Sequence, residues 1–178
     1  MPDGAPSEGV RGVEPVGRSM APVCFACRRR TTTGLREIAD GILDPENWSS
    51  FTGWGPLPGI RSARVITRTE GIVGTSFGVT DARGGMYTET ITRWDVDSVL
   101  EIRMDGFARP LSGLATHFIE RWRVEGGEAD SSGVGGGTRV VVRSFEMYPR
   151  SRIARPAVWL IGQMMRRAVD RHSARVLA

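Results

Sequence analysis

The chain has 178 residues, of which 40% are hydrophobic and 25% are charged, and its formal net charge is +4 at pH 7. This length suits one domain with a core that needs no disulfide or metal, and no segment approaches the roughly 20 apolar residues of a membrane span. All 24 basic residues are arginines interleaved with 20 acidic residues, a pattern typical of a solvated surface rather than a nucleic-acid interface.

The first 21 residues are expected to form a disordered leader. They are rich in Gly, Pro and charge and have no apolar period, so they cannot bury enough apolar surface to fold. They also lack the apolar segment of a signal peptide, and we therefore expect a cytoplasmic protein. Met20 precedes the first strand-like segment and is a candidate translation start. Residues 22–178 are predicted to form a single domain.

Cys24 and Cys27 form an isolated C-x-x-C motif. A zinc site would need two further ligands at suitable spacing, and the only histidines are His117 and His172. A thioredoxin-like motif should open a helix after a strand, whereas this pair lies in a strand-like segment, where residues three apart face opposite sides. We predict two reduced cysteines, no metal site and no cofactor.

A strand is predicted over residues 23–32, followed by two short helices. Thr33 is placed to cap the first helix, whose apolar residues have helical spacing: Leu35, Ile38, Ala39 and Ile42. The second helix should follow Asp44, because an N-cap aspartate, a first-turn proline and an acid facing the helix dipole occupy positions 44–46. Glycines and prolines at 53–59 then predict an irregular loop.

The apolar period changes from 3.6 to 2 after this loop and stays there for about 85 residues. Strands are predicted around 63–67, 77–79, 86–94, 100–104, 114–124 and 138–147, with turns at 84–85 and 95–98 and a long, flexible Gly-rich loop at 126–137. Leu100, Ile102 and Met104 alternate with charged residues, as in an antiparallel strand with one solvated face. Together with the first strand, the chain has seven predicted strands.

One long helix is predicted from about residue 151 to residue 176. Its apolar stripe is expected to consist of Ile153, Ala157, Leu160, Ile161, Met164 and Ala168. The segment 149–178 carries seven arginines and one acid. We expect the stripe to pack on the sheet and to leave a solvated basic face, with transient membrane contact as the alternative.

This order of elements predicts an α+β helix-grip fold: a curved, seven-stranded antiparallel sheet, two short helices and one long C-terminal helix that enclose an apolar cavity. The absence of βαβ alternation excludes a doubly wound parallel sheet. One helix cannot cover the whole concave face of a curved sheet. The remaining space is therefore a candidate pocket for a small molecule.

Several strings of residues resemble the START/Bet v 1-like (SRPBCC) superfamily, in particular its bacterial polyketide cyclase/dehydrase-like and lipid-transport branch. They are DPENW at 44–48, GPLPG at 55–59, ETITRWD at 89–95, GTRV at 137–140 and the C-terminal helix at 157–176. Each string is weak alone, whereas their order and spacing are specific for the fold. The resemblance covers residues 23–177.

The resemblance implies binding of a hydrophobic small molecule, such as a lipid, sterol, quinone or polyketide. We expect a carrier or sensor, because no strand face holds a tight cluster of titratable residues. One alternative is a polyketide cyclase/dehydratase-type enzyme that uses a cavity carboxylate as acid or base, and another is a co-chaperone or toxin-like interaction module. The expected partner is thus a small molecule, with no nucleic acid and no stable membrane insertion, and the oligomeric state stays open.

Glu120, Glu89 and Tyr87 are the candidates for acid–base chemistry. A carboxylate inside an apolar cavity is desolvated, which raises its pKa toward the range that suits a general acid or base. Glu120 shares the more apolar face of its strand with Phe118 and Trp122; its alternatives are a cross-strand pair with arginine or a place in water near the cavity mouth. Alternation leaves open which face of the 86–94 strand points inward, so a solvated Glu–Arg pair is the alternative for Glu89.

The predicted ligand-binding residues are Trp54, Phe77, Phe118, Glu120, Trp122 and Met164. Most of these aromatic side chains are expected to serve the core as well as the cavity. Trp54 differs from them because it lies in the Gly/Pro loop, where a portal or lid would lie. His117 has arginine neighbours on its face and no accompanying Ser or Cys nucleophile motif, so we predict a surface histidine.

Overall fold

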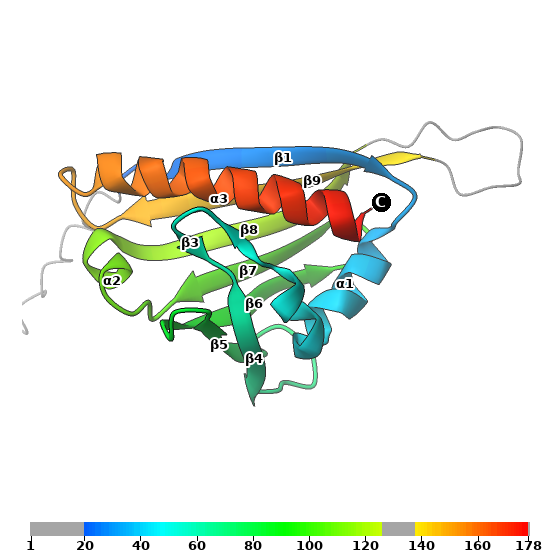
Figure 1. Cartoon of the computed structure of the whole chain (residues 1–178). Helices are drawn as coiled ribbons and strands as arrows, with labels where there is room; N and C mark the ends of the chain where they lie inside the picture. The colour runs from blue at the N-terminus through cyan, green and yellow to red at the C-terminus, as the bar shows by residue number, and fades with distance from the viewer. Residues whose placement is uncertain (1–19, 126–137, 178) are drawn as a thin grey trace, which may run out of the picture.

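The computed structural model describes residues 20–125 and 138–177, and its centre is a seven-stranded antiparallel sheet (Figure 1). The strand order is β1-β9-β8-β7-β6-β5-β4, so the first and last strands of the chain are neighbours. The strands are β1 (Val23–Thr31), β4 (Ile60–Thr67), β5 (Ser76–Asp81), β6 (Met86–Asp95), β7 (Val99–Asp105), β8 (Ala115–Glu125) and β9 (Arg139–Pro149). The helix-grip fold is therefore confirmed.

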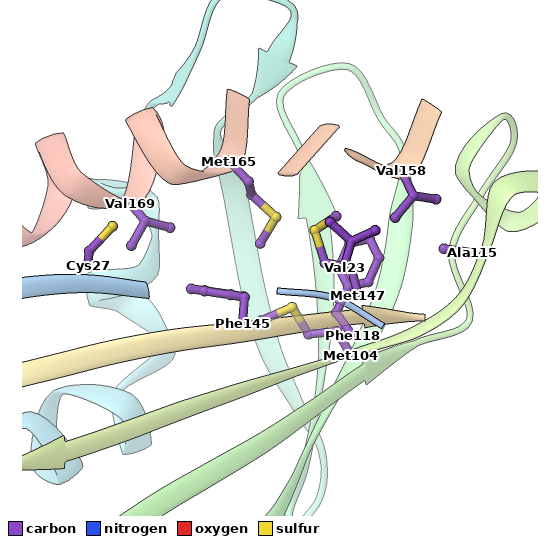
Figure 2. Close-up of a cluster of buried hydrophobic side chains, with 10 residues drawn as sticks. All are labelled: Val23, Cys27, Met104, Ala115, Phe118, Phe145, Met147, Val158, Met165 and Val169. Atoms are coloured by element: carbon purple, nitrogen blue, oxygen red, sulfur yellow. The ribbon is translucent and has the colours of Figure 1, made fainter. Parts of the chain in front are cut away.

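Helix α3 (Arg155–Val176) runs along the sheet beside β1 and β9 (Figure 1). Figure 2 shows Val158, Met165 and Val169 of α3 pointing toward side chains of the sheet, among them Phe145 and Met147. These residues belong to one buried cluster, in which Val158, Val169 and Met147 are fully buried. Burial of such side chains stabilises the fold by about 1.5–3 kcal/mol each, so α3 is fixed mainly by apolar packing.

The predicted apolar stripe of this helix is partly correct, since Ala168 is buried and Ile161 packs against the core, but the most buried face is shifted from it by about one residue. Ile153 and Leu160 are exposed, and Met164 is only partly buried. The buried positions of α3 are instead Val158, Gly162, Met165, Ala168, Val169 and Ser173, of which only Ala168 was predicted. One physical reason is Gly162. A Cβ there would lie 3.3 Å from the sulfur of Met147, so the helix comes close to the sheet at a glycine, which does not contribute to an apolar pattern in the sequence.

Two short helices follow β1 at one end of the sheet (Figure 1). Helix α1 (Leu35–Leu43) buries Leu35, Ile38, Ala39 and Ile42, as its spacing predicted. Its N-cap is Gly34 and not Thr33, because the side chain of the preceding Thr31 accepts the Thr33 N–H. The second helix is the 3-10 helix η1 (Pro45–Ser50), which Asp44 caps by accepting the N–H of Glu46.

The segment predicted to be an irregular loop contains a small hairpin of β2 (Gly53–Trp54) and β3 (Leu57–Pro58). Gly53 and Gly55 have φ angles of 72° and 57°, a left-handed conformation that glycine adopts at low cost. A Cβ at Gly53 would lie 2.3 Å from the carbonyl oxygen of Leu57. The glycines that argued against regular structure therefore make the tight turn possible.

Two further details concern short segments. Helix α2 (Leu111–Leu114) was not predicted and lies just before β8. Cys24 is exposed and Cys27 is buried, and both are free, so the predicted opposite orientation of the two cysteines on one strand is confirmed. The expected disorder of the leader and of the 126–137 loop lies outside the described residues, apart from the last residues of the leader.

Candidate functional site

A cavity of about 450 Å³ lies between the sheet, the short helices and the C-terminal half of α3. Its lining is mostly apolar and includes Ile38, Ile42, Trp48, Phe51, Ile102, Met104, Trp122, Phe145, Met165 and Val169. Its volume falls in the range of small-molecule sites. The exposed residues of the lining are Glu37, Asn47, Ser50 and Val176, so the cavity opens to solvent between the short helices and the end of α3.

Strand register decides which side chains of β6 face this cavity. Glu89 pairs with Met104 and Ile91 pairs with Ile102, and Ile102 in turn pairs with Glu120 on β8. Because side chains alternate across a strand, Tyr87, Glu89 and Ile91 share the concave face. The open question about the 86–94 strand is thereby answered.

Glu89 is a buried carboxyl group that no arginine balances in a salt bridge within the described parts of the chain. Desolvation and the nearby Glu120 raise its pKa to about 8, against the opposing effects of Arg143 and of a hydrogen bond from Tyr87. Glu89 is therefore mostly a neutral carboxylic acid at pH 7. The alternative of a solvated Glu–Arg pair is wrong.

Tyr87 lies two residues before Glu89 on the same face of β6. Its ring is partly buried and packs near Phe107, with 6.0 Å between ring centroids. Burial raises the pKa of the phenol well above its usual value, and the adjacent Glu89 adds to this effect. The phenol therefore keeps its proton over the physiological pH range and remains a hydrogen-bond donor.

Glu120, in contrast, is paired. It is buried on β8 and accepts a charge-assisted hydrogen bond from Nε of Arg143 on β9, which confirms the predicted alternative of a cross-strand pair with arginine. The Arg143 guanidinium also lies over the rings of Trp122 and Phe145, at 4.4 and 5.4 Å from their centroids. Two aromatic faces and a carboxylate thus hold this cation inside an apolar cavity.

His172 extends this polar group to the cavity mouth. Its Nδ1 lies 3.3 Å from Nη1 of Arg143, and its Nε2 lies 3.0 Å from Oγ of Ser50. Because arginine can only donate, Nδ1 must accept, and Nε2 carries the proton and donates to Ser50. Burial and the nearby Arg143 and Arg175 lower the pKa of His172 to about 4, so the imidazole is neutral at pH 7.

The structure brings four of the predicted site residues to the cavity: Tyr87, Glu89, Glu120 and Trp122. The others are absent from its lining. Phe77 and Phe118 are buried and pack on other aromatic rings, with centroid distances of 4.8 Å to Trp48 and 4.7 Å to Phe107. These two residues serve the core.

Trp54 and Met164 also lie outside the lining, each for a different reason. Trp54 sits on the β2–β3 hairpin with the Arg167 guanidinium 4.8 Å from its ring centroid, so it contacts the outer side of α3. Met164 is displaced by the phase of the helix, and its neighbour Met165 lines the cavity. His117 is partly buried on β8 and stacks on Tyr148, 4.2 Å between centroids.

Arg143 and His172 line the cavity but were not predicted as site residues. Arg143 lies two residues before Phe145 on β9, so alternation places it on the cavity face, but arginine is not an obvious residue for an apolar interior. His172 lies three residues after Val169 and seven after Met165, which is the spacing of one helix face. This signal was usable only with the correct phase of α3.

The described part of the chain holds no candidate metal site and no candidate membrane-spanning helix. No group of three or more His, Cys, Asp or Glu side chains in residues 20–125 and 138–177 is arranged to hold a metal ion. No helix in these same ranges is long and apolar enough to cross a membrane. The titratable side chains of the cavity wall are those of Tyr87, Glu89, Glu120, Arg143, His172 and the exposed Glu37.

Comparison with known proteins gives a family and a fold. The family model described as "Polyketide cyclase / dehydrase and lipid transport" matches residues 36–178, whereas no curated protein matches the sequence. A START superfamily protein from Mycobacterium smegmatis is similar in structure, with a TM-score of 0.56 and 9% identity over 86% of this chain and 98% of that chain.

Two further solved structures show the same likeness. Ara h 8.0201 has a TM-score of 0.54 and 13% identity, and major latex-like protein 151 from Panax ginseng has a TM-score of 0.53 and 14% identity. In each case the match covers 86% of this chain and 98% of the other. At such identities the likeness shows a shared fold and carries no information on the ligand.

Proposed function

We propose, from the premise that the chain belongs to the polyketide cyclase/dehydrase and lipid transport family, that it binds a hydrophobic small molecule in this cavity as a carrier or sensor. Its fold is that of the START/Bet v 1-like superfamily, as the sequence motifs predicted. Candidate ligands are a lipid, a quinone or a polyketide-like compound.

The observation that carries this proposal is the cavity of about 450 Å³ with its largely apolar wall. An apolar ligand that enters it leaves water, and each Å² of apolar surface removed from water contributes about 25 cal/mol. The exposed residues around the mouth give such a ligand a route from solvent. A co-chaperone or toxin-like interaction module needs no such space, so the cavity favours the ligand-binding role.

Native mass spectrometry of the recombinant protein, followed by organic extraction, tests the proposal. We expect a co-purifying lipid, quinone or polyketide-like molecule, or else saturable binding of the uncharged fluorescent probe N-phenyl-1-naphthylamine. An empty protein that leaves the probe fluorescence unchanged would overturn the binding role and would favour the interaction module.

A matched pair of variants links binding to this cavity. Gly41 lines the cavity on α1, and a Cβ at this position would meet open space, so Gly41→Phe should occupy part of the volume and weaken probe binding at least about tenfold by occlusion. Asp40→Phe places the same side chain on the same helix at an exposed position outside the lining. It should leave binding unchanged.

Glu89 supports a second candidate, an enzyme of the cyclase/dehydratase type. A carboxyl group with a pKa of about 8 can both donate and accept a proton near neutral pH, as a general acid or base must. The test is proton–deuterium exchange at the α-carbon of a bound β-dicarbonyl compound in deuterated water. An enzyme should accelerate the exchange and Glu89→Gln should abolish the acceleration; exchange at the solvent rate in both proteins would exclude this chemistry.

A further inference from the structure

We propose that the cavity selects uncharged ligands that carry a carbonyl or hydroxyl oxygen, which Glu89 and Tyr87 receive, and that it rejects ligands with a carboxylate. This inference rests on the proposed binding function and names the ligand class within it. It follows from an asymmetry of the buried polar groups: one carboxyl has a cationic partner and the other has none.

Glu89 is surrounded by side chains that cannot neutralise a negative charge on it. Its cross-strand neighbours are apolar, namely Phe77 on β5 and Met104 on β7. The titratable and charged groups around it, counting those of the cavity wall, are Tyr87 on β6, Glu120 on β8, Arg143 on β9, His172 on α3 and the exposed Glu37 on α1, with Asp81 of β5 near Tyr87. Of these, only Arg143 is a cation at pH 7.

Arg143 already has interaction partners within the protein. Its Nε binds Glu120, its Nη1 donates to His172, and its guanidinium plane faces Trp122. A ligand carboxylate would have to share this cation with Glu120 and would lie as a second anion in the same largely apolar cavity. A buried charge without its own partner is strongly disfavoured, so the built-in Glu120–Arg143 pair excludes anionic ligands.

Glu89 and Tyr87 provide the complementary recognition. The Tyr87 phenol donates to Glu89 and holds it in place, so in the protonated acid the Glu89 O–H is the donor left for a ligand oxygen. A buried donor left without a partner is costly. A ligand oxygen that accepts from Glu89 is therefore favoured over a pure hydrocarbon, which fills the cavity and offers this O–H no partner.

A ligand series with matched chain length tests this selectivity. A long-chain methyl ketone, the alkane and the alkanoate each compete with N-phenyl-1-naphthylamine for the full-length protein at pH 7. We expect the ketone to bind at least about tenfold more tightly than the alkanoate, and more tightly than the alkane, in keeping with one satisfied buried hydrogen bond. Equal or tighter binding of the alkanoate would overturn the inference.

Two substitutions assign the selectivity to Glu89. Glu89→Leu should bind the ketone no better than the alkane while still binding the probe, whereas the exposed Glu46→Leu, outside the lining, should keep the wild-type order. In the wild type, ketone affinity should fall between pH 7 and pH 9 as the donor is lost; Glu89→Gln should remove this dependence and keep the preference for the ketone over the alkanoate.

The outcomes separate the two claims. A ketone preference that persists in Glu89→Leu would overturn the assignment to Glu89 while leaving ligand binding intact. Failure of the wild-type protein to bind the probe and all three ligands would overturn the proposed function as well. Circular dichroism of each variant verifies that a loss of binding does not reflect a loss of fold.

Discussion

Glu89 and His172 line the same cavity, and burial shifts their pKa values in opposite directions. The pKa of the acid rises to about 8 and that of the imidazole falls to about 4, with desolvation as the first cause in both cases. Both shifts favour the neutral form. The buried charges of the cavity wall are therefore those of the Glu120–Arg143 pair, which cancel, while Glu37 lies exposed at the mouth.

The raised pKa of Glu89 predicts a pH-dependent stability difference for Glu89→Gln. The folded pKa lies above the unfolded value of about 4.5, so the folded protein binds more protons than the unfolded chain between about pH 4.5 and 8, and wild-type stability falls as pH rises through this range. Each pKa unit corresponds to about 1.4 kcal/mol. In urea unfolding, the free energy of unfolding of Glu89→Gln should rise relative to that of the wild type from pH 5 to pH 9. A difference between the two proteins that does not vary with pH would contradict the assigned pKa.

The lowered pKa of His172 predicts the opposite dependence of stability on pH. Its folded pKa lies below the ordinary value of 6.5, so the unfolded chain binds more protons between about pH 4 and 6.5, and stability is lost as the pH falls through this window. His172→Gln lacks this titration and should show a shallower loss of melting temperature from pH 7 to pH 4. If the variant lost as much melting temperature as the wild type between pH 7 and pH 4, His172 would not be buried as a neutral ring.

Some of the cavity residues could be predicted from the sequence, but their charge states could not. Alternation within β8 placed Glu120 and Trp122 on one face, and both line the cavity. The charge states of Glu89 and Glu120 could not be predicted, because they depend on which of the two carboxyl groups pairs with Arg143. That choice depends on the packing of β9 against β8 and not on any local pattern.

At the scale of elements, the phase of α3 shows how composition can mislead. Ile153 and Leu160 are large and apolar, yet they are exposed, while Gly162 and Ser173 are buried. Gly162 allows α3 to approach Met147 closely, and neither Gly162 nor Ser173 adds to the apolar pattern that marks a buried face in the sequence. The period of α1 was predicted correctly, because its buried residues are also its most apolar ones. On β6 the buried face carries Glu89, so alternation alone left the inward face of this strand open.

Two alanine substitutions on α3 test this phase. Val158→Ala removes two methyl groups from a fully buried position and should lower the free energy of unfolding by about 1.5–2.5 kcal/mol through lost burial and a small cavity. Leu160→Ala, at 56% exposure, should change it by less than about 0.5 kcal/mol. Chemical denaturation of both variants measures the difference; a larger cost at Leu160 would restore the predicted stripe.

For the whole molecule, the order of elements was sufficient to predict the fold. Seven antiparallel strands and one long terminal helix leave few ways to bury the helix. The cavity is a consequence of the same geometry, because α3 covers only part of the concave face. The position of its mouth could not be predicted, since it depends on how the β2–β3 hairpin and η1 meet α3.

Three contacts hold the segment around the mouth against α3. Arg167 lies over the ring of Trp54, Arg175 donates to Oγ1 of Thr52 at 3.1 Å, and His172 binds Ser50. Neither these two arginines nor their partners Trp54 and Thr52 belong to the cavity lining. They are suited to control how often the mouth opens rather than how tightly a ligand is held.

The double variant Arg167→Ala/Arg175→Ala should therefore speed ligand exchange. Loss of an exposed cation–π contact and one surface hydrogen bond costs only about 0.5–1.5 kcal/mol each, enough to raise the population of open states several-fold. Stopped-flow measurements with N-phenyl-1-naphthylamine should show higher rates of both association and dissociation, with Kd changed by less than about twofold. Arg171→Ala removes an exposed arginine of the same helix and should leave both rates unchanged. A changed Kd with unchanged association would instead place these arginines in the ligand site, and equal rates in all three proteins would place the entrance elsewhere.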